Sequence, residues 1–186
     1  MLTQEGKREK ILTAYLNLLV LQGIRAATLE AVSSACQLSK AGVLHHFSSM
    51  GALRQAIFVE LEAQASADAN KMLADLANAA NYYLVSSLSR DSLLERLIEA
   101  VHRLAQTGDE SALELLRICR RGWYEALLLA LGDAALAKLV LFAGDGINHN
   151  VLLSVDENSE TFLDASTATD MLDLVERLRE TAGPRA

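Results

Sequence analysis

Proline, aromatic residues and long apolar runs are scarce in this sequence, and each scarcity excludes a class of protein. Among the 186 residues there is one proline, Pro184, and the aromatic share is 5%. Because proline breaks helices, the long stretch before it can form helices without interruption. No apolar run reaches the roughly 18 residues that a membrane-spanning helix needs. The start, MLTQEGKREKIL, is too polar for a signal peptide, so we expect no membrane association.

Cysteine and catalytic motifs are equally scarce. The two cysteines, Cys36 and Cys119, form no metal-ligand spacing and suggest a reducing cytoplasm. The sequence has no nucleophile elbow, no metal signature and no phosphate-binding loop. We therefore expect a cytoplasmic protein that is not an enzyme and carries no cofactor, and an α-helical enzyme ranks last among the functions considered.

The residues that are abundant favour an all-α fold. Apolar residues make up 51% of the chain, which suffices for a sizeable core, and leucine and alanine dominate over β-branched runs. Gly23 is a C-terminal stop for the first helix. Apolar periodicity and capping residues predict helices at about 4–22, 28–35, 39–46, 50–76, 78–88, 91–106, 109–131, 134–154 and 165–181.

The net charge of −7 is unevenly distributed along the chain. Residues 1–55 contain six lysines and arginines against three acidic residues, a balance of +3. The remaining residues contain 11 against 21, a balance of −10. A positive head on an acidic body suits an oriented DNA-binding domain, although chance clustering in a short window is the alternative.

The segment from Thr28 to Phe47 reads as two short helices joined by a tight turn. Helical spacing in the first places Leu29, Val32 and Ala35 inward. Cys36-Gln37-Leu38 then interrupts the pattern, and Ser39 is a good N-cap for the second helix.

The second of these helices has an outer face without bulk. Val43 and Phe47, four residues apart, would hold it to a core. The residues left outside are Lys40, Ala41, Gly42, His45 and His46. A small helix with a cation at its start suits the major groove of DNA.

Several positions of this region follow one family pattern: Gly23, Thr28, Leu38-Ser39-Lys40, Val43, His46-Phe47, Ser49 and Leu53. With the helix before it, the region resembles the N-terminal domain of the tetracycline-repressor (TetR) family of bacterial transcription regulators. The resemblance covers about the first 60 residues and implies a DNA-binding domain over 1–55, followed by a helical ligand-binding and dimerisation domain over 56–186. It implies a ligand-responsive transcriptional repressor that binds operator DNA. The implied DNA-contacting residues are Thr28, Ser39, Lys40, Ala41, Gly42, His45 and His46.

Four departures from the pattern lie in the same region. Gln37 and Ala41 stand where the family usually has glycine, Leu44 and His45 replace an aromatic phosphate contact, and Met50 replaces a lysine. Because phosphate contacts supply much of the affinity for DNA, we expect weaker binding than is usual in the family. The alternative is an interaction protein that kept this fold and lost DNA binding.

The last two predicted helices each carry an apolar stripe. The first stripe comprises Leu136, Leu139, Val140, Ala143, Ile147 and Val151, with Gly144 and Gly146 permitting close approach, and the second comprises Met171, Leu174, Val175 and Leu178. The resemblance implies that these helices pair with those of a second subunit, and we favour a homodimer. The alternative is that both stripes form the core of one subunit.

The resemblance also implies an effector pocket among the central helices, at about 55–131. Arg120 lies on the apolar line of Leu113 and Trp123, where a charge needs a partner. We hypothesise that Arg120, Trp123 and Tyr124 border a pocket for an amphipathic or anionic ligand. An internal ion pair or a snorkelling side chain is the commoner explanation.

Asp145 and His149 lie four residues apart and could belong to a metal site. No third ligand accompanies them, so we favour an intrahelical pair and predict no metal.

Overall fold

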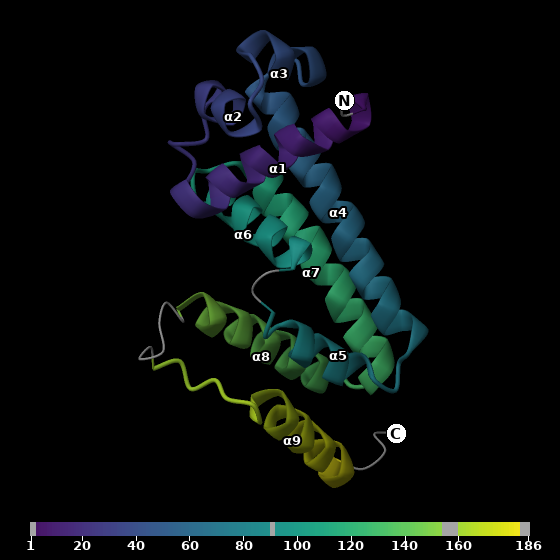
Figure 1. Cartoon of the computed structure of the whole chain (residues 1–186). Coiled ribbons are helices and arrows are strands. Elements are labelled where there is room, and N and C mark those ends of the chain that lie inside the picture. The colour runs from purple at the N-terminus through teal and green to yellow at the C-terminus, as the bar shows by residue number, and fades with distance from the viewer. Residues whose placement is uncertain (1–2, 90–91, 154–159, 183–186) are drawn as a thin grey trace. The chain divides into compact units, whose positions relative to one another are not determined.

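The computed structural model describes residues 3–89, 92–153 and 160–182. Within these ranges the regular structure is helical, with no strand, which confirms the all-α prediction. The helices are α1 (Gln4–Gln22), α2 (Leu29–Cys36), α3 (Lys40–His46), α4 (Met50–Ala74), α5 (Ala79–Ser86), α6 (Leu93–Ala105), α7 (Glu110–Leu131), α8 (Ala134–Leu153) and α9 (Thr167–Ala182) (Figure 1). No helix in the described part is long and apolar enough to cross a membrane.

The helix limits follow from local capping. Thr3 accepts a hydrogen bond from the Gly6 amide at the start of α1, and Gly23, with φ of 82°, ends that helix. Asp109 accepts from the Ala112 amide at the start of α7. The predicted limits at residues 91 and 154 lie outside the described residues.

The described residues form two compact units. The first comprises Met1–Gln64 and Leu93–Ile118, and the second comprises Ala65–Ser92 and Cys119–Ala186. Each of the helices α4 and α7 contributes one segment to each unit. The predicted division of function at residue 55 stays a prediction.

In the first unit, α1 packs against both α2 and α6, and α2 packs against α3. Its largest fully buried side chains are Ile11, Leu19, Val32, Val43, Leu53, Ile57, Leu61, Leu97 and Val101. They come from α1, α2, α3, α4 and α6, so one core fixes the two short helices to the longer ones.

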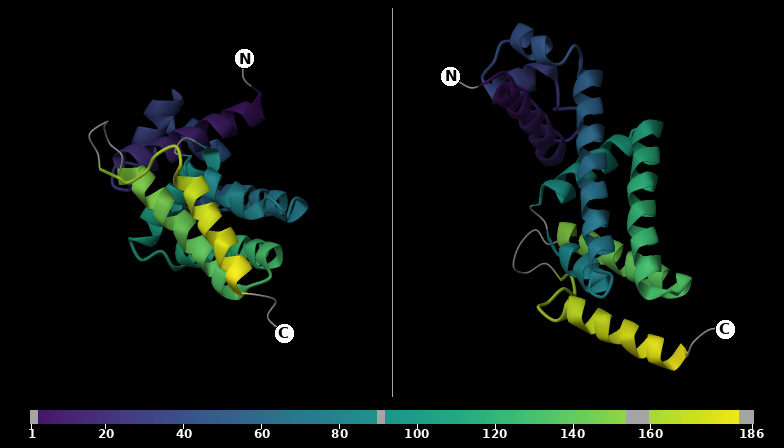
Figure 2. Two further views of the ribbon diagram at one scale, coloured as in Figure 1. Left: turned by 90° about the horizontal axis from the view of Figure 1, so that it is seen from below. Right: turned by 90° about the vertical axis from the view of Figure 1, so that its right-hand side faces the viewer.

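In the second unit, α5 packs against α8 and α9, and α8 contacts α9 (Figure 2). The apolar core includes Met72, Leu84, Leu127, Val140, Ile147, Val151 and Val175. Gly144 allows the close approach of α5 to α8, because a Cβ there would lie 2.4 Å from Tyr83 Cε1. Gly146 has no such neighbour within the chain, since a Cβ at that position would meet nothing within 4 Å, and its approach to a helix of a second subunit stays a prediction.

One further detail of the predicted elements is wrong. Ala35 is exposed, and Cys36 takes the buried position in the last turn of α2. The start of α9 at Thr167 is preceded by two local hydrogen bonds: Asp164 accepts from the Ser166 amide, and the Thr167 hydroxyl accepts from the Asp164 amide. The predicted start at about residue 165 thus lies within two residues of the observed one.

Candidate DNA-binding interface

The turn between α2 and α3 is fixed by backbone hydrogen bonds. The Thr28 hydroxyl accepts from the Ala31 amide at 3.2 Å and caps the start of α2. Gln37 adopts the left-handed conformation, with φ of 57° and ψ of 40°, and its amide donates to the carbonyls of Ser33 and Ser34. The left-handed residue reverses the chain direction so that α3 begins directly after the turn.

The inner side of α3 is held by packing and by one arginine from α1. Val43 is fully buried and Phe47 is 2% exposed. The Arg8 guanidinium lies 4.1 Å from the centre of the Phe47 ring and donates to the His46 carbonyl at 3.0 Å. Arg8 thus satisfies a carbonyl at the end of α3 and fixes that end against α1.

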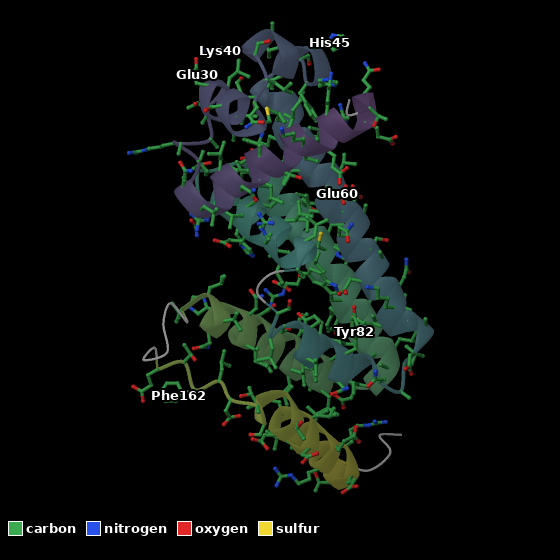
Figure 3. The ribbon with its side chains drawn as sticks, in the orientation of Figure 1. Glu30, Lys40, His45, Glu60, Tyr82 and Phe162 are labelled. Carbon is green, nitrogen blue, oxygen red and sulfur yellow. The ribbon has the colours of Figure 1, made fainter. Side chains whose placement is uncertain are left out.

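The outer side of α3 presents the small and polar residues that the sequence predicted. Lys40, Ala41 and His45 are exposed, whereas Gly42 and His46 are half-buried (Figure 3). The Ser39 hydroxyl accepts from the Gly42 amide at 3.0 Å and so caps the helix. The His45 and His46 rings meet edge to face, with centroids 5.3 Å apart.

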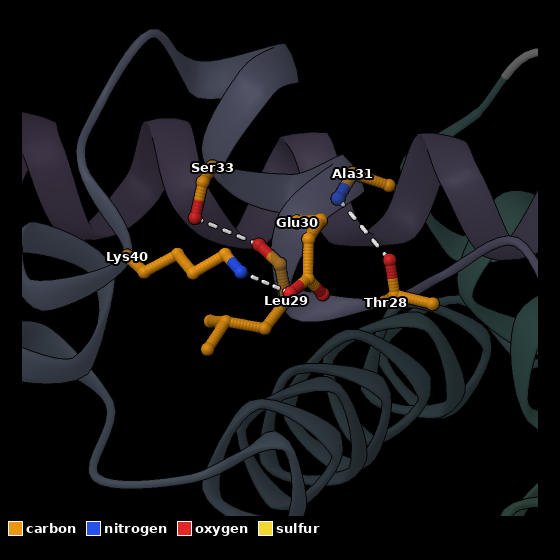
Figure 4. A network of polar contacts seen from close by, with 6 residues as sticks. All are labelled: Thr28, Leu29, Glu30, Ala31, Ser33 and Lys40. Carbon is orange, nitrogen blue, oxygen red and sulfur yellow. Dashed lines mark hydrogen bonds and ion pairs between the residues drawn. The ribbon is translucent and has the colours of Figure 1, made fainter.

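The cation at the start of α3 has a partner on α2. The Lys40 ammonium donates to the Glu30 carboxylate, and both side chains are more than half exposed (Figure 4). The hydrogen bond from Lys40 is the main reason why the pKa of Glu30 lies below its usual value. Glu30 therefore stays charged at neutral pH and neutralises Lys40 locally.

The structure brings the predicted DNA-contacting residues together on α2, α3 and the turn between them. Two of these residues, Thr28 and Ser39, cap helices. The hydroxyl oxygens of Thr28 and Ser39 each accept a hydrogen bond from a backbone amide. In an interface, each hydroxyl can therefore still donate its own hydrogen to a DNA oxygen. Sequence reasoning missed Arg8 and Glu30. Arg8 is 38 residues from His46 in sequence, and Glu30 is ten from Lys40, so neither pair follows a helical spacing.

The predicted effector residues lie in the second unit and have partners within the protein. Arg120 is not on a buried line: its side chain is 47% exposed, pairs with Asp145 and lies 5.3 Å from the centre of the Phe142 ring. Leu113, predicted on the same line, is 39% exposed. The apolar spacing along α7 overestimated burial, and the ion-pair explanation describes Arg120 better than the buried charge does.

Trp123 contacts a buried carboxylate. Its indole nitrogen donates to Asp68 at 3.0 Å, and the Tyr82 hydroxyl donates to the other oxygen of Asp68 at 2.6 Å. Burial, together with the hydrogen bond to Asp68, raises the pKa of Tyr82 to about 12. Tyr124 is half-buried beside Trp123 along α7. The carboxylate thus ties α4, α5 and α7 of this unit together.

Asp145 contacts residues of two other helices. Besides Arg120 it accepts from the Tyr83 hydroxyl at 3.5 Å. Among the described residues, no group of three His, Cys, Asp or Glu side chains could hold a metal ion.

Comparisons with known proteins identify the N-terminal region and the fold. The family model of bacterial regulatory proteins of the tetR family matches residues 11–57, which run from α1 into α4. The search of curated proteins gave no match.

Three solved structures are similar over nearly the whole chain. A candidate TetR-family transcriptional regulator from Rhodococcus sp. is 13% identical with a TM-score of 0.65, over 93% of this chain and 98% of its own. Salmonella enterica GusR is 18% identical with a TM-score of 0.64, over 97% and 98%. A candidate transcriptional regulator from Streptomyces coelicolor A3(2) is 19% identical with a TM-score of 0.61, over 93% and 98%.

The matched segment contains the two short helices, the left-handed turn and the capped α3, which is the geometry described above. The resemblance noted from the sequence is confirmed. The chain therefore shares its fold with TetR-family transcriptional regulators, and its residues 11–57 match the family model of bacterial regulatory proteins of the tetR family.

Proposed function

We propose that the chain is a DNA-binding transcriptional repressor that acts in the cytoplasm as a homodimer and releases its operator when a small molecule binds. The observation that carries this proposal is the exposed, unbulky face of α3 on a rigidly capped turn, within a segment that matches the tetR family. Ala41 and Gly42 leave room for close approach to base edges, while Lys40 and His45 supply polar contacts.

The homodimer follows from the geometry of DNA. Two recognition helices reach successive major grooves only if a dimer holds them about one helical turn of DNA apart. Apolar side chains at the surface of α8 and α9 are suited to such an interface: Leu139, Phe142, Leu152, Leu153, Met171, Leu174 and Leu178 are each 38–58% exposed.

The effector response is proposed to involve Arg120, Trp123 and Tyr124. Their neighbours Asp68 and Asp145 come from α4 and α8, so a ligand that competed for these contacts would disturb more than one helix. Binding would bias α4 and change the separation of the two DNA-binding regions. Effector-dependent DNA release should be lost in Arg120→Leu, and unchanged release would exclude this residue.

A mobility-shift titration of the purified chain on its own upstream region tests DNA binding. We expect a sequence-selective shift whose affinity falls steeply between about 50 and 200 mM salt. Lys40→Ala should weaken binding, whereas Arg121→Ala, which removes the same charge from an exposed position on α7, should not.

The absence of any salt-sensitive, selective shift would favour the second candidate, a TetR-fold interaction protein without DNA binding. The exposed Leu44 on α3 motivates this candidate, as does Met50 at the start of α4, because neither side chain can contact phosphate electrostatically. Retained dimerisation in that experiment would support it further.

A further inference from the structure

The segment from Thr28 to Phe47 contains a single carboxylate and a single lysine, and the structure pairs them. The carboxylate is Glu30 in the first turn of α2, and the lysine is Lys40 in the first turn of α3. The nearest other lysine or arginine in either direction is Arg25 or Arg54. Lys40 is thus the one permanently charged cation that this segment can offer to DNA, and it is already paired with Glu30.

The Glu30–Lys40 pair joins two helices at the surface. The Lys40 side chain is 55% exposed and that of Glu30 is 64% exposed, and the Lys40 side chain extends from α3 across to α2 (Figure 4). An exposed ion pair contributes little net free energy, so another anion can displace the carboxylate from Lys40. A DNA phosphate is an anion of the same kind, with oxygens that accept the same hydrogen bond.

We propose that Glu30 is an autoinhibitory residue that mimics a DNA phosphate, so that DNA must displace its carboxylate from Lys40 before that lysine can contact the backbone. This inference rests on the proposed DNA-binding function and names a residue that regulates it. A glutamate carboxylate is charged at every pH near neutrality, so the inhibition is constant there. Glu30 would then weaken DNA binding without touching the DNA.

The decisive variant is Glu30→Gln, which keeps the size of the side chain and removes its charge. DNA affinity at low salt should rise about two- to fivefold, which is what an exposed pair of this kind is worth. The slope of log affinity against log salt should stay nearly the same, because Lys40 contacts a phosphate in both complexes once Glu30 has been displaced. In a Lys40→Gln background, Glu30→Gln should lose most of this gain in affinity, because no lysine is left to release.

The matched control is Glu9→Gln. Glu9 is an exposed carboxylate on α1, so this variant makes the same change in net charge in the same unit. A larger gain in DNA affinity at low salt for Glu30→Gln than for Glu9→Gln supports the proposal. Equal gains in affinity in the two variants, or weaker DNA binding by Glu30→Gln, would overturn it, because the carboxylate would then act only through general charge or as a DNA contact.

A measurement without DNA separates this inference from the proposed function. The carboxyl titration of Glu30, followed by NMR in the free protein, should move upward in Lys40→Gln if the pair exists. If the titration shows the Glu30–Lys40 pair but the wild-type protein binds no DNA, the proposed function and this inference are overturned together. Salt-sensitive DNA binding by a protein whose Glu30 titration ignores Lys40 would overturn this inference alone.

Discussion

Gln37 shows how a single residue can hold backbone strain beside a proposed interface. With φ of 57° it lies in the left-handed region, which costs a residue with a side chain about 1–2 kcal/mol relative to the right-handed helix. The conformation persists because the Gln37 amide bonds to two carbonyls of α2 and because Val32 and Val43 are buried on either side of the turn. The turn is therefore imposed by its surroundings rather than favoured by its own residue.

Replacing this residue should stabilise the protein. Gln37→Gly removes the left-handed cost, and the greater freedom of glycine in the unfolded chain offsets about 0.5–1 kcal/mol of the gain. We expect the free energy of unfolding to rise by about 0.5–1 kcal/mol, measured by urea denaturation. The same change at exposed Gln55 inside α4 should lower it by about 1 kcal/mol. Destabilisation by Gln37→Gly would show that the turn carries no such strain.

Among the elements, α8 offers two glycines with opposite surroundings. Gly144 faces α5, where a Cβ would lie 2.4 Å from Tyr83 Cε1 and 2.8 Å from the Ser87 hydroxyl oxygen. Gly146 lies two residues further along the same helix, and a Cβ at this position would have nothing within 4 Å. The two positions therefore separate the effect of helix packing from that of helix propensity.

Alanine at these two positions should change stability in opposite directions. Gly144→Ala overpacks the contact with α5 and should lower the free energy of unfolding by about 1–3 kcal/mol. Gly146→Ala gains helix propensity and should raise it by about 0.5–1 kcal/mol in thermal or urea unfolding. If both variants were stabilised, the close contact between α5 and α8 would not constrain the fold.

The elements also show which features the sequence could predict. Caps and stops are local, so Thr28, Ser39 and Gly23 indicated where α2 and α3 begin and where α1 ends. Contacts between helices are not local. The stacking of Arg8 on Phe47 and the pair of Glu30 with Lys40 depend on how α1, α2 and α3 pack, which periodicity alone does not specify. Arg120 was misplaced for the same reason, because an apolar spacing gives a face of α7 but not what covers it.

For the whole molecule, the two predicted apolar stripes divide between core and surface. Val140, Ile147, Val151 and Val175 are buried within the second unit, as the single-subunit alternative requires. The half-exposed Met171, Leu174 and Leu178 recur at three- and four-residue spacing along α9 and form an apolar face at its surface. One subunit therefore uses only part of the stripes, and the exposed part is what a second subunit would bury.

The final prediction concerns this exposed face and the DNA binding that depends on it. Leu174→Asp puts a charge at a position that is 40% exposed in the single chain and buried in the proposed dimer. We expect light scattering after gel filtration to change from dimer to monomer, and operator affinity to fall at least tenfold because each half-site is then bound alone. Leu129→Asp, on α7 and 62% exposed, should leave both measurements unchanged. Leu174 belongs to the second unit and the α3 face to the first, so the substitution does not alter the proposed DNA-binding face directly. Helical circular dichroism checks that the variant is folded. A Leu174→Asp protein that stayed dimeric would place the subunit interface elsewhere, and a wild-type monomer that bound its operator tightly would remove the need for one.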